Sequence, residues 1–285
     1  MKLFDSHCHI DDDCFNDDFD DVLMRAEKTG VYAMMIAGVT LETCRKAVCI
    51  AEQYDHIFSA VGIHPHDAKN CSDQTIDSLK ALARSTRVKA WGEIGLDFNR
   101  MFSPAEIQEK WLEKQMAAAD ESDLPIIFHE RDSKGRFLDI LKNFNFEERQ
   151  GVVHCFSGTK EEMFSYLDLG YYIGITGILT IKKRGACLRK LAEMIPEDRI
   201  VIETDAPYLT PAPEKNKHRR NEPAFVASVM EKLAQIRNKT SENLSETLWD
   251  NTCRLYRIKQ TDKGFDLGCL KPAFWPSFYC SFFGP

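Results

Sequence analysis

Six of the eight histidines lie in four short motifs, each at the end of an apolar run. In the first motif, "FDSHCHI", His7 and His9 are two residues apart, so a strand would point both side chains to one side and Cys8 to the other. Two imidazoles on one face can chelate a single metal ion. The other motifs contribute His64 and His66 in "VGIHPHD", His129 in "PIIFHER" and His154 in "VVHCFSG".

Two carboxylates end further apolar runs, Glu93 in "WGEIGLDF" and Asp205 in "VIETDAPYL". Neutral imidazole with carboxylate is typical of Zn, Mn, Fe, Co or Ni sites and less typical of Mg or Ca sites. The sequence predicts two divalent metal ions, of identity open among Mg, Mn, Zn, Co and Ni, with Glu93 on a middle strand as the bridging ligand. One tetrahedral ion needs fewer ligands than the candidate set provides, which is His7, His9, Glu93, His129, His154 and Asp205.

The elements that must position these residues follow a regular alternation. Short apolar runs alternate with longer amphipathic stretches along most of the chain, as in βα units around a parallel sheet. Eight such pairs in roughly 200 residues favour an α/β fold, a TIM (β/α)8 barrel of the metal-dependent hydrolase type. An open doubly wound sheet is the structural alternative. The predicted strands are 2–6, 31–37, 57–62, 88–93, 125–129, 151–154, 171–175 and 199–203.

In such a barrel the loops at the carboxyl ends of the strands surround one central crevice, where catalytic groups lie. The histidine and carboxylate motifs occur at these ends, although strand ends make up only a small part of the chain. We therefore expect the candidate ligands to meet in this crevice. His56 and His218 fit no strand end and are expected to be solvated loop residues.

The helices carry their own signals. Ser103 is a plausible N-cap, with Pro104 at the first helical position and Glu106 completing a capping box. Two further helical stretches, 222–237 and 241–258, would close the barrel.

No Pro-, Gly- or Ser-rich linker divides the alternating region, so residues 1–258 are predicted to form a single TIM-barrel hydrolase domain. Residues 259–285 form an aromatic-rich tail without helical or strand periodicity. This tail could cover an apolar patch, take part in an oligomer contact or be disordered, and the sequence leaves its role open.

Composition places the chain among ordinary globular proteins, with 44% hydrophobic and 28% charged residues in 285. No apolar run reaches the length of about 18 residues that suggests a membrane span, and Asp5 interrupts any signal-peptide core. A cytoplasmic protein without a membrane partner is therefore expected. The formal charge of −7 argues against a bulk electrostatic grip on nucleic acid but says nothing about one local cleft. The ten cysteines follow no regular framework, and most are expected to be reduced.

The predicted loops at the strand ends differ in charge. The first loop, "DDDCFNDDFDD", is acidic; Asp11–Asp13 could offset the basic loops, bind cations or cap a helix, and Asp17 and Asp18 are expected to cap. Four other loops are basic and would hold an anionic substrate through phosphate contacts. A cleft that is positive on one side only suits a single strand or a chain end better than a duplex. The basic residues are Arg100, Arg131, Lys134, Arg136, Lys182, Lys183, Arg184, Lys215, Lys217, Arg219 and Arg220.

Together with "RNEP" and "NTCRLY", these motifs resemble the TatD family of metal-dependent deoxyribonucleases, within the amidohydrolase-like barrels. The resemblance covers about residues 1–258 and stops before the tail. It implies hydrolysis of phosphodiester bonds in DNA, by a 3'-5' exonuclease that prefers single strands. It also implies that one ion is held by His7, His9, Glu93 and Asp205, the second by Glu93, His129 and His154, and the scissile phosphate by His66 and Arg131.

The expected reaction is attack of a metal-activated water on phosphorus, with Glu93 and Asp205 as the catalytic carboxylates and Asp205 as the general base. Glu203 and Asp97 are expected to orient ligand imidazoles, unless they form inward salt bridges. Two other functions stay open: an amide, lactone or ester hydrolase on the same barrel, and a metal-binding protein without turnover. The sequence does not decide between DNA and RNA, between exonuclease and endonuclease, or between oligomeric states.

Overall fold

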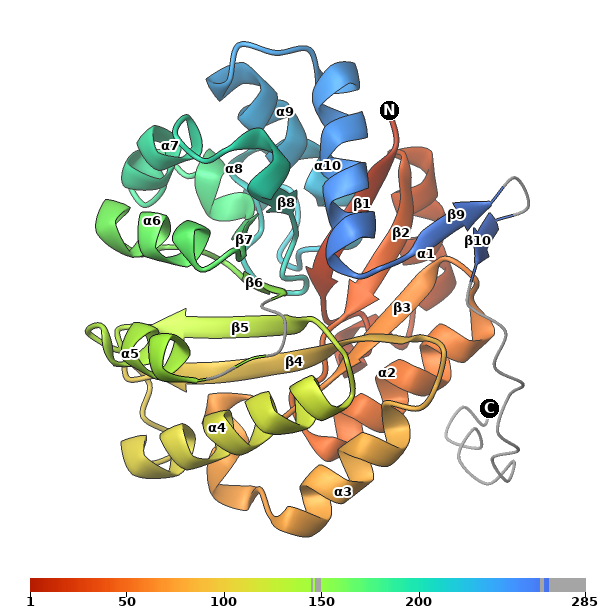
Figure 1. Cartoon of the computed structure of the whole chain (residues 1–285). Helices are drawn as coiled ribbons and strands as arrows, with labels where there is room; N and C mark the ends of the chain where they lie inside the picture. The colour runs from red at the N-terminus through yellow and green to blue at the C-terminus, as the bar shows by residue number, and fades with distance from the viewer. Residues whose placement is uncertain (145, 147–149, 262–263, 267–285) are drawn as a thin grey trace.

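Eight parallel strands form one sheet whose order follows the chain from the first strand to the eighth (Figure 1). The computed structural model describes residues 1–144, 146, 150–261 and 264–266. A doubly wound sheet would instead place its first strand in the interior, so the predicted TIM barrel is confirmed. The strands are β1 (Leu3–Cys8), β2 (Val31–Ile36), β3 (Ile57–Val61), β4 (Val88–Asp97), β5 (Ile126–Arg131), β6 (Gly151–Val153), β7 (Tyr172–Ile175) and β8 (Ile200–Ile202).

The last strand meets the first mainly through side chains and loop backbone. The Asp5 carboxyl group on β1 accepts hydrogen bonds from the backbone N–H of Thr204 (2.8 Å) and from its hydroxyl (2.5 Å). Beyond the end of β8, the N–H of Asp205 donates to the carbonyl oxygen of His7 on β1 (2.9 Å). These bonds hold the loop after β8 against β1, and so bring two of the candidate ligands together.

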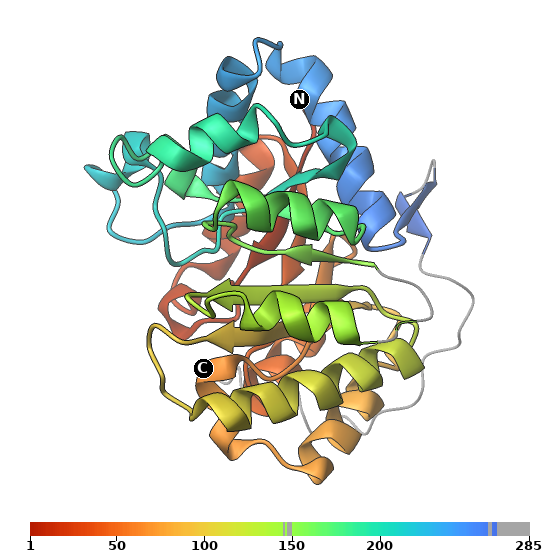
Figure 2. The same ribbon diagram turned by 60° about the vertical axis from the view of Figure 1, so that its left-hand side comes forward.

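Helices cover the outside of the barrel (Figures 1 and 2). No helix within the described ranges is both long enough and apolar enough to cross a membrane. The α-helices are α1 (Phe19–Lys28), α2 (Leu41–Gln53), α3 (Asp73–Leu82), α4 (Ala105–Glu121), α5 (Arg136–Asn143), α6 (Lys160–Asp168), α7 (Ala186–Ala192), α8 (Ala212–Lys215), α9 (Val226–Ile236) and α10 (Ser241–Leu255).

The predicted start of α4 was wrong in its cap. Pro104 is the N-cap residue and makes no side-chain capping bond. The Ser103 hydroxyl instead donates to the carbonyl oxygen of His66 (3.0 Å) and accepts from the N–H of Lys69 (3.0 Å). The hydroxyl therefore makes tertiary hydrogen bonds and no helix cap. These bonds tie the loop after β3 to the loop after β4.

The amino ends of the strands are filled by aromatic side chains. Phe4 on β1 lies 6.0 Å from the Phe58 ring and 5.6 Å from the Trp249 ring, measured between centroids. The described part of the tail adds a small antiparallel sheet, β9 (Lys259–Thr261) with β10 (Gly264–Asp266), which the sequence pattern did not reveal. Its Phe265 contacts the Phe58 ring edge-on at 5.2 Å and stacks on Trp249 at 6.1 Å. Residues 262–263 and 267–285 lie outside the described chain, and the domain boundary at 258 stays a prediction.

Candidate metal and active centre

The predicted ligands converge at the carboxyl ends of the strands. These ends point to the left for β4 and β5 in Figure 1 and come forward in Figure 2. The imidazoles and carboxylates are largely withdrawn from solvent, from the fully buried His7 to the His129 side chain at 17% exposure. The expectation that these residues meet at the carboxyl ends of the strands agrees with the geometry. They come from β1 and its end (His7, His9), β4 (Glu93), β5 (His129) and the loops after β6 (His154) and β8 (Asp205).

Glu93 lies between two sets of imidazoles. Its Oε2 is 3.4 Å from Nε2 of His7 and 3.9 Å from Nε2 of His9. Its Oε1 is 2.7 Å from Nδ1 of His129 and 3.4 Å from Nε2 of His154. Each carboxylate oxygen therefore faces a different group of nitrogens, which is the arrangement that a bridging ligand needs.

The first group of donors gathers around His7. Its Nε2 is 3.2 Å from Nε2 of His9 and 3.6 Å from Oδ1 of Asp205, and that oxygen is 3.4 Å from Nε2 of His9. The His154 ring stacks on the His7 ring at 3.7 Å between centroids. His7 therefore belongs to two candidate metal clusters, one with His154 and Asp205 and one with His9 and Glu93.

The second group contains a histidine to which the sequence reasoning gave no role as a ligand. Nε2 of His64 lies 3.2 Å from Nδ1 of His129 and 3.5 Å from Oε1 of Glu93, and these three residues form a candidate metal cluster. Among the described residues, no such cluster contains both His129 and His154, whose rings are 6.2 Å apart. The assignment of His154 to a second ion therefore stays a prediction, with His64 as an additional candidate.

The signal for His64 was its spacing. "HPH" repeats the two-residue spacing of "HCH", but Pro65 begins a 3-10 helix (Pro65–Asn70), so the alternation of a strand does not apply there. His64 turns toward Glu93, whereas His66 turns toward Asp97. The two imidazoles therefore have different carboxylate partners, although they are only two residues apart.

Two buried carboxylates, Asp97 and Glu203, contact three imidazole rings from outside the metal clusters. Oδ2 of Asp97 is 2.7 Å from Nε2 of His66 and 3.3 Å from Nε2 of His129. Oε1 of Glu203 is 3.0 Å from Nδ1 of His154 and accepts from the N–H of Cys155 (2.6 Å). Such contacts fix both the orientation and the tautomer of an imidazole.

The electrostatics of the centre favour a cation. Burial raises the pKa of Glu93, but the charges of His154 and His64 and the hydrogen bond from His129 outweigh it and hold the pKa well below its usual range. Burial likewise opposes protonation of His9, yet its hydrogen bond to Asp205 raises its pKa to about 9. Among the described residues, no lysine or arginine pairs with Glu93 or Asp205. The donor set of nitrogens and ionised oxygens therefore fits divalent ions that prefer imidazole and carboxylate.

The two residues predicted to contact phosphate lie beside this centre. His66 has a side chain 34% exposed and is held by Asp97. Arg131 ends β5, is half-buried, and lies opposite Asp97 in the register of β4 and β5. Their contact with a phosphate stays a prediction.

The basic loops are only partly available. Arg136 pairs with Glu109 at 2.7 Å, and Arg220 pairs with Asp18 at 2.7 Å. Asp18 is the N-cap residue of α1 but makes no capping bond, because its carboxylate binds Arg220 and Arg25. Besides Arg136, the exposed members of the predicted rim are Arg100, Lys134, Lys182, Lys183, Arg184, Lys215, Lys217 and Arg219.

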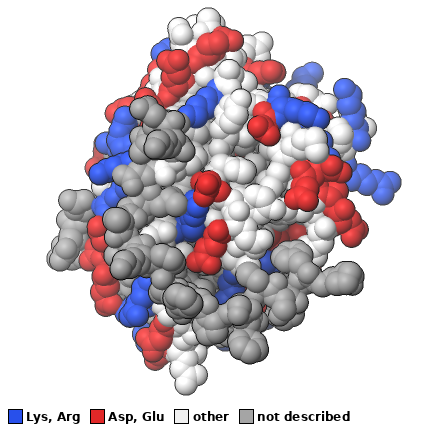
Figure 3. Space-filling model, turned by 90° about the vertical axis from the view of Figure 1, so that its right-hand side faces the viewer, with Lys and Arg blue, Asp and Glu red and all other residues white. Residues whose placement is uncertain are grey.

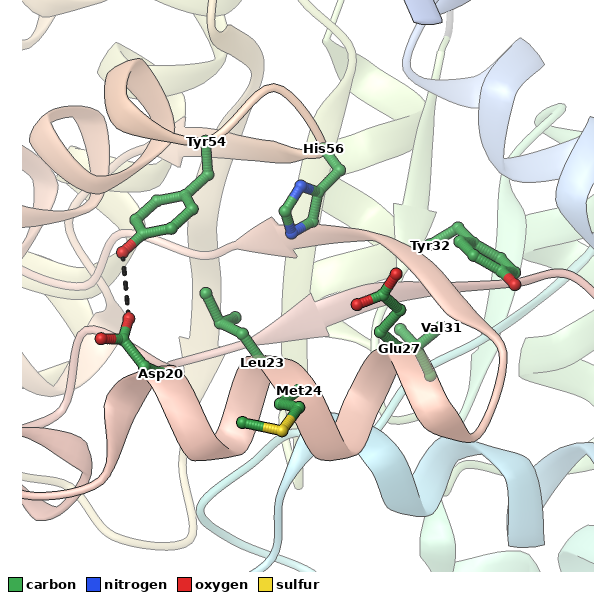
Figure 4. Close-up of a pocket in the computed structure, with 8 residues that line it drawn as sticks. All are labelled: Asp20, Leu23, Met24, Glu27, Val31, Tyr32, Tyr54 and His56. Atoms are coloured by element: carbon green, nitrogen blue, oxygen red, sulfur yellow. Dashed lines mark hydrogen bonds between the residues drawn. The ribbon is translucent and has the colours of Figure 1, made fainter.

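A separate pocket of about 410 Å³ lies at the amino end of the barrel (Figure 4). Its wall contains one histidine, His56, which is half-buried rather than solvated as predicted; His218 is exposed. The Tyr54 hydroxyl donates to Asp20 at 3.4 Å. No candidate metal cluster of the described chain includes a residue of this pocket, which is lined by Asp20, Leu23, Met24, Glu27, Val31, Tyr32, Tyr54 and His56.

The face that carries β9 and β10 is shown in Figure 3, where the acidic and basic side chains of the described residues are interspersed. This face lies opposite the histidine clusters. The mixed signs of the described residues form no continuous field for a polyanion among themselves. The geometry thus places the candidate chemistry at the carboxyl end of the barrel.

Comparison with known proteins agrees with this geometry. The family model described as "TatD related DNase" matches residues 4–257. The 3'-5' ssDNA/RNA exonuclease TatD of Citrobacter koseri is 40% identical over 258 residues, which are 90% of this chain and 99% of that protein. A TatD homologue from Escherichia coli has a crystal structure that superposes with a TM-score of 0.83 at 30% identity, covering 90% of this chain and 98% of the other.

A hydrolase of the TatD family from Entamoeba histolytica superposes with a TM-score of 0.81 at 28% identity, covering 90% of this chain and 98% of that one. The family match extends across the whole barrel and stops before the tail. By its motifs, its fold and its relatives, this chain belongs to the family of TatD-related DNases.

Proposed function

We propose that this protein is a divalent-metal-dependent nuclease that removes nucleotides from the 3' end of single-stranded DNA. The observation that carries the proposal is the position of Glu93, whose two oxygens face separate sets of imidazoles. Curated relatives named 3'-5' ssDNA/RNA exonuclease TatD support the substrate class. RNA is the second substrate that those names include.

In this proposal two ions share Glu93. His7, His9 and Asp205 complete the first set, and His129 completes the second with His154, while His64 is a further candidate in contact with His129. When bound, such ions supply Lewis-acid activation of water and neutralise charge on a phosphoryl group.

Asp205 is the proposed general base. Burial raises its pKa, but the hydrogen bond with His9 and the neighbouring imidazoles outweigh that effect and hold the pKa below its usual value. The carboxylate is therefore ionised at neutral pH, and its side chain keeps 14% exposure to solvent. It can accept a proton from a water molecule that attacks the substrate.

His66 and Arg131 are the proposed phosphate contacts. Asp97 holds the His66 ring through its Nε2 at 2.7 Å and leaves a third of the side chain exposed. The imidazole is already held in place before the substrate binds. Together with the guanidinium at the end of β5, it can orient one phosphate at a lower cost in conformational entropy.

The proposal is tested with metal-depleted protein and oligonucleotides labelled at the 5' or the 3' end. Single-stranded DNA, duplex DNA and RNA are each incubated with Mg, Mn, Zn, Co or Ni. Release of single nucleotides from the 3' end of single-stranded DNA is expected. The matched variants are Glu93→Gln, which should lose activity, and Glu193→Gln at an exposed site, which should keep it.

Cleavage by wild type that survives Glu93→Gln would overturn the assignment of the site. Absence of cleavage with every ion would overturn the nuclease proposal. In that case amide, lactone and ester substrates are tested next, since the same barrel type supports those reactions without dependence on His66 or Arg131.

A further inference from the structure

Two strongly exposed aromatic rings stand beside the histidine clusters. Phe102, in the loop after β4, is 54% exposed, and Tyr208, in the loop after β8, is 56% exposed. In a barrel whose strand order follows the chain, β4 and β8 are four strands apart and therefore lie on opposite sides of the crevice. The rings thus flank the candidate centre from two sides.

Phe102 contacts the side of the centre that is proposed to hold phosphate. Its ring lies 4.8 Å from the His66 ring, at an interplanar angle of 78°. The adjacent Ser103 hydroxyl bonds to the carbonyl oxygen of His66, and the Ser103 carbonyl accepts from Nε2 of Gln108 at 2.8 Å. The backbone that carries Phe102 is therefore fixed, although more than half of its side chain is open to solvent.

Tyr208 contacts the opposite side. Its ring lies 6.0 Å from the His9 ring, at an angle of 65°. Its N–H donates to the carbonyl oxygen of Asp205 at 2.8 Å, and its own carbonyl oxygen accepts from Nδ2 of Asn221 at 2.5 Å. This ring too is carried by a fixed backbone and left uncovered.

Among the described residues, the ring contact of Phe102 is with His66 and that of Tyr208 is with His9, and both rings remain more than half exposed. A flat ligand would cover such a ring. Every nucleobase has a π-face, so stacking on an aromatic side chain tolerates any sequence, and it requires bases that are not already stacked in a duplex. A chain with a net charge of −7 gains from this mode, since stacking needs no positive field.

We propose that Phe102 and Tyr208 are stacking platforms for two nucleobases on either side of the bond that is cut. This inference rests on the proposed nuclease function and deepens it. The two platforms position a single strand across the centre and account for a preference for single strands over duplexes. They are positioning residues, because they hold bases and leave the reacting atoms to other groups.

The test compares Phe102→Ala and Tyr208→Ala with two controls, Tyr32→Ala and Phe164→Ala, which remove exposed rings elsewhere. Binding of a fluorescent single-stranded oligonucleotide is measured by anisotropy on metal-depleted protein, and KM and kcat are measured on the metal-loaded enzyme. Each platform variant is expected to weaken binding and raise KM about tenfold, with kcat within about twofold. Tyr208→Phe keeps the ring and should bind like wild type.

An abasic site in the oligonucleotide identifies the stacked base. If stacking is the interaction, the abasic oligonucleotide should bind wild type as weakly as the normal one binds Tyr208→Ala, and combining both changes should cost little more. Duplex DNA should lose little affinity in either platform variant.

Unchanged binding of single strands by both alanine variants would overturn the stacking proposal even if the wild type cleaves DNA. Weakened binding without cleavage by any metal-loaded protein would instead keep the platforms and overturn the nuclease function. The binding and cleavage measurements therefore distinguish the two failures.

Discussion

The two ends of the barrel are built from the same strands, but the amino end holds apolar aromatic side chains and the carboxyl end holds imidazoles and carboxylates. On β1, Phe4 at the amino end packs among aromatic rings, and His7 near the carboxyl end meets other imidazoles. The step from one environment to the other takes three residues. A parallel barrel permits this, because all strands start at one end and finish at the other.

The carboxyl end of the barrel shows how a polar centre can be buried. Imidazoles and carboxylates withdrawn from water are costly unless they are paired. Here each has at least one atom close to another member of the cluster or to Asp97 or Glu203, while Nδ1 of His7 has no hydrogen-bond partner among the described residues. The aromatic end contributes stabilisation by burial of apolar surface without need of partners. We therefore expect changes at the carboxyl end to alter activity most, and changes at the amino end to alter stability most.

The largest effect is expected for Glu93→Ala. Removal of this carboxylate takes away the oxygen atoms that face both sets of imidazoles, so metal content and nuclease activity should fall together, the activity by about 10³-fold. Metal content is measured on purified protein and activity on labelled oligonucleotides. An exposed control, Glu193→Ala, should keep both. Full activity in the Glu93 variant would contradict the expectation that the carboxyl end determines activity.

Next in size is Phe4→Ala at the amino end. The Phe4 ring is 2% exposed and touches Phe58, Trp249 and Tyr256, so its removal leaves a cavity and should lower the free energy of unfolding by about 3 kcal/mol. Urea unfolding measures the change, and metal content should match wild type. Tyr32→Ala, an exposed control at the same end, should be nearly neutral. Loss of metal in folded Phe4→Ala protein would show that the two ends are coupled.

A smaller effect on activity is expected for Asp97→Asn. The amide cannot hold His66 and His129 as the carboxylate does, so activity or metal affinity should fall about 10- to 100-fold while the fold persists. Steady-state kinetics and metal titration measure these quantities, with Asp77→Asn at an exposed position of α3 as the control. If neither the activity nor the metal affinity changes, Asp97 has only a structural role.

The smallest effect concerns the rim of the carboxyl end. The hydrogen bond from Arg220 lowers the pKa of Asp18 to about 2, below its ordinary value of 3.8. The unfolded chain therefore takes up the proton first as pH falls, so this stabilisation is present above pH 3.8 and is lost toward pH 2. Because solvent screens the pair, it should contribute about 1 kcal/mol.

Asp18→Asn should accordingly lower the free energy of unfolding by about 1 kcal/mol at pH 6, and the difference from wild type should shrink as the pH is lowered. Urea unfolding at several pH values measures it. Asp17→Asn, at an exposed neighbouring position, serves as the control. A difference that is constant with pH would exclude ionisation of Asp18 as the cause.

The local sequence pattern was sufficient to predict the barrel and to select most of the residues that the structure brings together at the candidate centre. The alternation of apolar runs predicted all eight strands within a few residues, although β4 continues to Asp97, four residues past the predicted end. That extension places Asp97 against His66 and His129. It was hidden because "IGLD" reads as the start of a loop when the register with β5 is unknown.

The local sequence pattern failed where a side chain contacts residues that are distant in the sequence. Ser103 has the spacing of a capping residue, yet its hydroxyl joins two loops. His64 resembles its neighbour His66, but the turn at Pro65 sends it to Glu93. Phe265 belongs to a segment without periodicity, and only its contacts with Phe58 and Trp249 reveal a role at the amino end.

The sequence by itself determined the alternation of strands and helices, the residue types at the strand ends and the family, because these follow from patterns and motifs along the chain. The tertiary structure alone decided which oxygen of Glu93 faces which imidazole, that His64 joins His129, and that Phe102 and Tyr208 stand uncovered on opposite sides. These facts depend on how the eight strands, in chain order, curve into one barrel. The barrel brings together groups up to about 200 residues apart, and no local spacing encodes the distance between them.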